Sequence, residues 1–249
     1  MTAPIPRDIP DLPPVPGHRA LLPTVVPATA VVTPVRRRLI AVFRLLTALL
    51  ALTGVTIELL VGGPVLKTLS HFTIQSGLLL ALVMIASARC AWSAQHPLPG
   101  AITGAALLYV ATAGLVHHLL LTNAASPFVA PDGAGPGWQT AATHILHTAV
   151  PLAAALDWLL LTVPGRLHLR QAPTWLLYPL AYLAFTLARG ELLLPGTQDR
   201  YLYPFLDVDQ HGFKGVLGNA LLVGLALYAL AVLLIALDHI RPNPLRRPR

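Results

Sequence analysis

Two histidines and an aspartate lie inside an apolar stretch that is long enough to cross a membrane. The stretch covers roughly residues 140 to 163 and contains His144, His147 and Asp157. Ionisable side chains are costly in hydrocarbon, so they usually mark a pathway, a pairing or an active site. His144 and His147 are three residues apart, which would place them on one face of a helix. The sequence therefore predicts a polar site within this stretch.

Three kinds of chemistry fit the two histidines. As metal ligands they would need further donors, for which His117, His118 or Glu191 are available. As haem ligands, one of them would face His117 or His118 from a neighbouring helix. As an acid or base, a neutral His147 would accept a proton from a nearby hydroxyl. Either histidine alone could instead form only a hydrogen bond between helices.

The composition indicates a membrane protein. Hydrophobic residues make up 55% of the 249 residues and charged residues only 11%, whereas a soluble domain carries about twice that charge. The net charge of +7 does not point to nucleic acid, because Lys and Arg are scattered through short loops without interleaved aromatics. The single cysteine, Cys90, permits no intrachain disulfide and no clustered thiolate site.

Six apolar stretches predict an all-α bundle of six transmembrane helices. Each is close to the roughly 20 residues that cross a bilayer, and turn-forming Pro and Gly separate them. The runs are too long and too little alternating for barrel strands. They cover approximately residues 39 to 60, 71 to 91, 101 to 122, 140 to 163, 173 to 193 and 214 to 238.

Regions of different character flank this bundle. The first 34 residues hold nine of the 24 prolines and no continuous apolar core, which favours a disordered tail over a signal peptide. We therefore expect a proline-rich cytoplasmic tail at residues 1–35, a six-helix transmembrane domain at 36–240 and a basic cytoplasmic tail at 241–249. Neither the length nor the loops predict an oligomeric state.

The distribution of Lys and Arg predicts the orientation. Excess positive charge stays in the cytoplasm. With six spans, one side collects Arg7, Arg19, Arg36, Arg37, Arg38, Arg89, Arg166, Arg170, Arg241, Arg246, Arg247 and Arg249, and the other only Lys67, Arg189, Arg200 and Lys214. Both termini are therefore expected in the cytoplasm of a cell-membrane protein.

Sorting the polar residues of the spans by depth separates two groups. Most fall in the outer half, which allows a shared pocket there; they are Glu58, Thr73, Gln75, Ser76, His117, His118, His144, His147, Arg189 and Glu191. Arg44 and Asp157 lie in the inner half at equal depth on spans one and four. An unpaired charge in lipid costs more than a paired one, so we expect a salt bridge between these two residues that braces the helices.

Three short motifs resemble the androgen-induced-protein family of six-pass membrane proteins, in its bacterial branch. They are the segment from Lys67 to Ser76 with its Phe72-Thr73-Ile74 step, the Pro136-Gly137-Trp138 loop leading to His144-Ile-Leu-His147-Thr148, and the Tyr203-Pro204-Phe205-Leu206 loop. Their order and spacing match over roughly residues 39 to 240. The sequence departs from the family at Ser76, where the animal proteins have an acidic residue, and at Pro151, which differs from the family's proline by one position.

What the resemblance implies is a hydrolase. Animal members cleave fatty acid esters of hydroxy fatty acids with a threonine and a histidine, which fall on Thr73 and His147 of this chain. His144 matches a further family histidine. The resemblance implies no cofactor and no metal.

The resulting hypothesis is a membrane threonine hydrolase with Thr73 as nucleophile and His147 as base, acting on a lipid ester in the bilayer. A threonine hydroxyl needs such a base within about 2.6 to 3.2 Å. The developing oxyanion needs donors, for which Gln75, Ser76, His144 and Arg189 are the candidates. The alternatives are a haem-binding redox protein and a proton-linked transporter or structural membrane protein without catalysis.

Overall fold

The structure is a computed structural model that describes residues 37–129, 137–197 and 199–242. The expected tail at 1–35 lies outside the described residues, as does most of the basic tail at 241–249. Within the described ranges all regular elements are helical and no strand occurs. The fold class is therefore that of an all-helical protein, as the sequence predicts.

Within the described residues, five helices are long and apolar enough to cross a membrane. They are α2 (Arg38–Val61), α4 (Phe72–Trp92), α5 (Gly100–Val116) with its continuation η1 (His117–Leu121), the run Gly137–Leu161, and α10 (Val208–Ile240). The run Gly137–Leu161 consists of α6 (Gly137–His144), η2 (Ile145–Ala149), α7 (Val150–Leu156) and η3 (Asp157–Leu161). These lengths and compositions are those of a multi-pass membrane protein.

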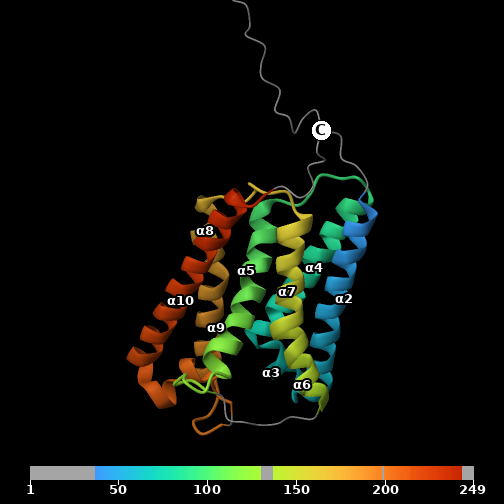
Figure 1. Cartoon of the computed structure of the whole chain (residues 1–249). Coiled ribbons are helices and arrows are strands. Elements are labelled where there is room, and N and C mark those ends of the chain that lie inside the picture. Colours follow the sequence, from blue (N-terminus) through green and yellow to red (C-terminus); the bar gives the residue numbers. More distant parts are fainter. Residues whose placement is uncertain (1–36, 130–136, 198, 243–249) are drawn as a thin grey trace, which may run out of the picture. The chain divides into compact units, whose positions relative to one another are not determined.

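The fifth apolar stretch, 173 to 193, forms two helices instead of one. They are α8 (Ala172–Trp175) and α9 (Leu177–Leu192), and η4 (Leu169–Gln171) precedes them. With 16 residues, α9 is about 24 Å long at 1.5 Å per residue, less than the roughly 30 Å of a hydrocarbon core. The helix nevertheless runs alongside α10 in the bundle, and the start of α2 and the end of α10 lie at the same end (Figure 1). A sixth crossing stays a prediction.

Small residues let the central helices approach closely. Ala48 and Ala51 of α2 and Ala81 of α4 are fully buried in a core that also holds Leu108 of α5. At Gly54 of α2 an added Cβ would lie 2.8 Å from the Leu146 side chain of η2. Such contacts are typical of helix packing in membranes, where small residues bring backbones together.

Three segments of the bundle are π-helical: η1, η2 and η3. They contain His117, His147 and Asp157, whereas Arg44 and His144 lie in α-helical segments. Pro151 follows η2 and has no N–H to donate to the carbonyl of His147 four residues earlier, which favours a departure from α-helical bonding there. Widened turns of this kind are frequent at functional sites.

The expected pair braces α2 against η3. Arg44 Nε donates a 2.8 Å hydrogen bond to Asp157 Oδ1, and Arg44 Nη2 contacts the other carboxylate oxygen at 3.3 Å. Thr162 Oγ1 lies 3.1 Å from Asp157 and 3.2 Å from Arg44, so both charged groups have a further partner. The aspartate is only 6% exposed. The pair therefore has the satisfied geometry that a buried ion pair requires.

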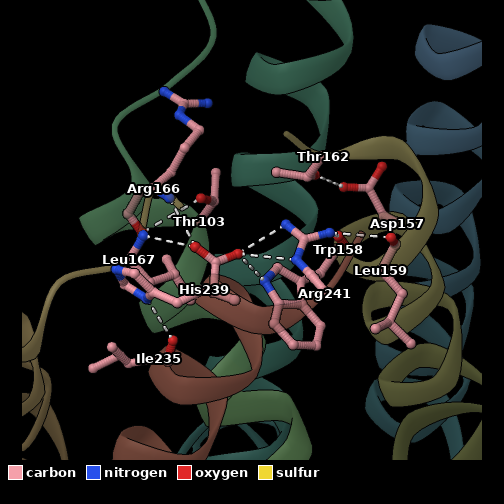
Figure 2. Close-up of polar contacts among 12 residues, drawn as sticks. Thr103, Asp157, Trp158, Leu159, Thr162, Arg166, Leu167, Ile235, His239 and Arg241 are labelled. Carbon is pink, nitrogen blue, oxygen red and sulfur yellow. Dashed lines mark hydrogen bonds and ion pairs between the residues drawn. The ribbon is translucent and has the colours of Figure 1, made fainter. Parts of the chain in front are cut away.

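A second brace, centred on Asp238 near the end of α10, was not anticipated from the sequence. Its carboxylate is 1% exposed and accepts hydrogen bonds from the backbone N–H of Arg166 and Leu167 at 2.8 and 2.9 Å. Trp158 Nε1 donates at 3.2 Å and Arg241 Nη2 at 2.8 Å (Figure 2). This arrangement ties α10 to the turn after η3.

Candidate active site

Thr73 and His147 come together in the bundle. The Thr73 hydroxyl oxygen lies 3.1 Å from His147 Nε2. His147 Nδ1 lies 3.0 Å from the carbonyl oxygen of Thr143, which can only accept a hydrogen bond. The proton of the neutral ring is therefore on Nδ1, and Nε2 is free to accept the hydrogen of the Thr73 hydroxyl. This is the arrangement of a nucleophile and its base.

The start of α4 positions Thr73. A short helix, α3 (Val65–Leu69), precedes it, and His71 is the N-cap residue in extended conformation. The next residue, Phe72, donates its backbone N–H to the hydroxyl oxygens of Tyr182 and Tyr203, each at 3.1 Å. The helix has no side-chain cap, and two tyrosines from distant segments bond its first free N–H instead. They thereby hold the first turn, which carries Thr73.

Another histidine supports the His147 ring. His117 of η1 stacks on it with ring centroids 4.1 Å apart and planes 22° from parallel. His118 Nε2 contacts Thr148 Oγ1 at 3.0 Å. Both contacts join η1 to η2, so the two π-helical segments hold the imidazole in place.

The stacked rings bear on the haem and metal hypotheses. Axial haem ligands point at the iron from opposite faces of the macrocycle, whereas the His117 and His147 rings lie face to face at contact distance. Both ring nitrogens of His147 already have partners. Among residues 37–129, 137–197 and 199–242, no three His, Cys, Asp or Glu side chains gather as a metal site would require.

An apolar cavity reaches the dyad. Its volume is about 470 Å³, within the roughly 300–1,000 Å³ usual for small-molecule sites. Thr73, His147, Thr112 and the tyrosines at 182, 203 and 228 supply its polar groups, and aliphatic and Phe side chains form most of the remaining wall. The cavity extends between α9 and α10, where its walls include Leu180, Leu183, Leu221 and Gly224.

Charged residues anchor the segment that brings Tyr203 to the site. Asp199 pairs with Lys67, and Arg200 pairs with Asp209 at 2.7 Å and with Glu191 at 3.6 Å. These contacts connect the turn between α9 and α10 to α3 and to both neighbouring helices. The turn ends in η5 (Pro204–Leu206), whose N-cap residue is Tyr203.

Burial affects two titratable groups beside the dyad that lie outside the membrane-spanning helices. It lowers the pKa of His71, although hydrogen bonds to the carbonyls of Thr68 and Lys67 oppose the shift. It raises the pKa of the Tyr203 hydroxyl, and hydrogen bonds with Thr73 and Tyr182 partly offset that rise. Both groups are therefore neutral at pH 7.

Of the four residues expected to support the dyad, three have other partners and His144 is exposed. The widened turn that begins at Ile145 removes His144 from the face of His147. Ser76 donates to the carbonyl of Thr73 one turn back. Gln75 donates to the Leu69 carbonyl and accepts from Tyr178, while Arg189 donates to the carbonyls of residues 199 and 200. A role of these four residues as oxyanion donors stays a prediction.

Sequence reasoning missed the tyrosines and Asp238. Tyr203 lies in one of the motifs quoted for the family resemblance, but an aromatic residue in a loop gives no separate sign of a polar role. Asp238 could have been noticed as an acidic residue within an apolar stretch, three residues before Arg241. An acidic residue at such a place needs a partner.

Comparison with known proteins finds no matching family model, no matching curated protein and no matching solved structure. The resemblance to the androgen-induced-protein family therefore rests on the three short motifs of the sequence.

Proposed function

We propose that this protein is a membrane-embedded hydrolase of lipid esters, with Thr73 as the nucleophile and His147 as the general base. The observation that carries the proposal is the 3.1 Å contact between the Thr73 hydroxyl and His147 Nε2, on the wall of an apolar cavity. The Nδ1 contact to the Thr143 carbonyl gives His147 the tautomer that the role requires. The three motifs of the sequence favour the same two residues.

The reaction proceeds by acyl transfer to the threonine. Thr73 Oγ1 attacks the ester carbonyl carbon while its proton moves to His147 Nε2. The tetrahedral intermediate collapses and the alkoxide leaves with the proton from His147. Water, activated by the same nitrogen, then hydrolyses the acyl-threonine. The acyl chain lies in the cavity between α9 and α10, where the walls are apolar.

The proposed setting is the cell membrane, with six crossings and both termini in the cytoplasm. The excess of Lys and Arg at the end of the bundle where α2 begins supports this orientation. The dyad, near the start of α4, would then lie in the outer half of the bilayer, where a lipid ester can reach it without leaving the membrane.

The test is labelling of the purified protein in detergent with a fluorophosphonate probe that carries a long alkyl chain. Wild type should be labelled and Thr73→Ala should not. His147→Gln should label about 10² to 10⁴ times more slowly, as loss of a general base predicts. Labelling of Thr73→Ala at the wild-type rate would disprove the nucleophile assignment.

Thr112→Val is the matched control. Thr112 lines the same cavity, but its hydroxyl donates to the carbonyl of Leu108 in its own helix. The variant keeps the shape of the side chain and should label at the wild-type rate. Equal losses in the Thr73 and Thr112 variants would point to a change in the cavity and not to a lost nucleophile.

A further inference from the structure

Tyr203 lines the cavity that reaches the dyad, whereas none of the four residues that the sequence proposed as oxyanion donors does. Its side chain is 9% exposed and lines the cavity beside Thr73 and His147. The hydroxyl oxygen accepts the N–H of Phe72, the residue before Thr73, at 3.1 Å. This places the hydroxyl at the first turn of α4, one residue from Thr73.

The two tyrosine hydroxyls at the start of α4 differ in how their protons are used. The Tyr182 hydroxyl donates to the Ser70 carbonyl at 2.9 Å. In the contacts of the described residues, the Tyr203 hydroxyl accepts from backbone and has no carbonyl to which it donates. The Tyr203 hydrogen can therefore be directed into the cavity, toward a bound ester.

We propose that Tyr203 is a catalytic residue whose hydroxyl donates a hydrogen bond to the carbonyl oxygen of the ester as Thr73 attacks. This inference rests on the proposed function. As the Thr73 oxygen bonds to carbon, the carbonyl π electrons move to oxygen and the Thr73 proton moves to His147. The Tyr203 hydroxyl hydrogen then bonds to the new oxyanion, and this bond is released when the leaving group departs.

The surroundings favour this role. The Phe72 N–H donates to the Tyr203 oxygen, which makes the hydroxyl hydrogen a stronger donor through a polarised chain. The oxyanion would also lie at the N-terminal end of the 21-residue helix α4, where the helix dipole favours negative charge. The earlier candidates Gln75 and Arg189 are engaged with other groups.

Steady-state hydrolysis of p-nitrophenyl decanoate by the full chain in detergent tests the proposal, with Tyr203→Phe beside wild type. The variant should lose about 10²- to 10³-fold in kcat, as removal of one oxyanion donor does elsewhere, with KM changed less than threefold. Tyr109→Phe is the control, because it also removes a buried tyrosine hydroxyl, which donates to the Trp175 carbonyl, but Tyr109 is not part of the cavity wall. It should keep the wild-type kcat.

A second variant distinguishes a catalytic role of Tyr203 from a purely structural one. Incorporation of 3-fluorotyrosine at position 203 keeps the shape but lowers the pKa of the phenol. It should move the alkaline limb of the kcat profile to lower pH, since the deprotonated phenol cannot donate. A residue that only caps α4 would leave that limb in place, and such a result would overturn the proposal.

The outcomes separate this inference from the proposed function. If Tyr203→Phe keeps wild-type kcat while Thr73→Ala has none, only the role of Tyr203 is wrong. If wild type and Thr73→Ala hydrolyse the ester equally, the proposed function fails and the role of Tyr203 fails with it. A large loss of kcat in folded Tyr203→Phe, with Thr73→Ala inactive, supports both.

Discussion

The ion pair between Arg44 and Asp157 gives a direct test of bracing at the level of single residues. Arg44→Ala would leave a buried carboxylate without its cation, which costs about 3–5 kcal/mol. The double variant Arg44→Ala, Asp157→Ala removes both charges and should be destabilised less. Thermal melting in detergent measures the difference. Identical melting of the single and double variants would argue against the brace.

His71 predicts a pH dependence of stability. Burial lowers its pKa, so below about pH 6.5 the unfolded chain binds more protons at this position than the folded chain. The contribution to stability is complete above pH 6.5 and falls as the pH drops toward the folded-state pKa. Wild type should therefore lose more in melting temperature between pH 8 and pH 5 than His71→Gln, in which glutamine can still donate to a carbonyl. Parallel losses would contradict this.

The rarity of ionisable groups in apolar stretches was enough to single out His147, Arg44 and Asp157, whereas Thr73 came from the family resemblance. These four residues each lie against the partner that the sequence reasoning assigned to them. Spacing predicted His144 on the face of His147, but spacing fixes a face only in a regular α-helix, and the role of His144 stays a prediction. Tyr203 could not be derived, since its contact with the first turn of α4 depends on how a loop folds back over the bundle.

At the scale of elements, the contact between α5 and η2 sets the position of His147. An added Cβ at Gly114 would lie 2.7 Å from the backbone oxygen of His147, which no side-chain rotation can relieve. Gly114→Ala should therefore cost about 1–3 kcal/mol and slow probe labelling by moving His147 away from Thr73. Gly218→Ala on α10 meets nothing within 4 Å and is the control for both measurements. Full labelling of Gly114→Ala would mean that η2 can shift without harm to the dyad.

The cavity between α9 and α10 predicts selectivity for chain length. Gly224 lines it and has open space where a side chain would project. Gly224→Phe should leave acetate esters unaffected and slow decanoate esters roughly tenfold, because each excluded methylene forfeits about 0.8 kcal/mol of burial. Gly218→Phe also projects into open space but lies outside the cavity wall. Equal slowing of short and long esters would contradict an acyl site there.

At the scale of the whole molecule, α9 decides the topology. In a Cys90→Ser background, Leu169→Cys lies before α8 and Pro195→Cys after α9, and both positions are exposed. If α9 crosses the bilayer, an impermeant maleimide should label only Pro195→Cys in intact cells, and Leu169→Cys only after lysis. Equal labelling of the two variants would mean that α9 does not cross the bilayer and that the chain has five crossings. The sequence could predict the other spans more securely, since each forms one uninterrupted helical run of full length.

The π-helical segments have a consequence for how this chain tolerates changes in length. A π turn holds one residue more than the α-helical path it replaces. Deleting one residue of η2, such as Ala149, would restore regular α-helical bonding along the same path, and the side chains within the turn would then point in different directions. His147 would face away from Thr73 with both side chains intact. The spacing along this helix is thus as much a requirement of the site as the side chains themselves.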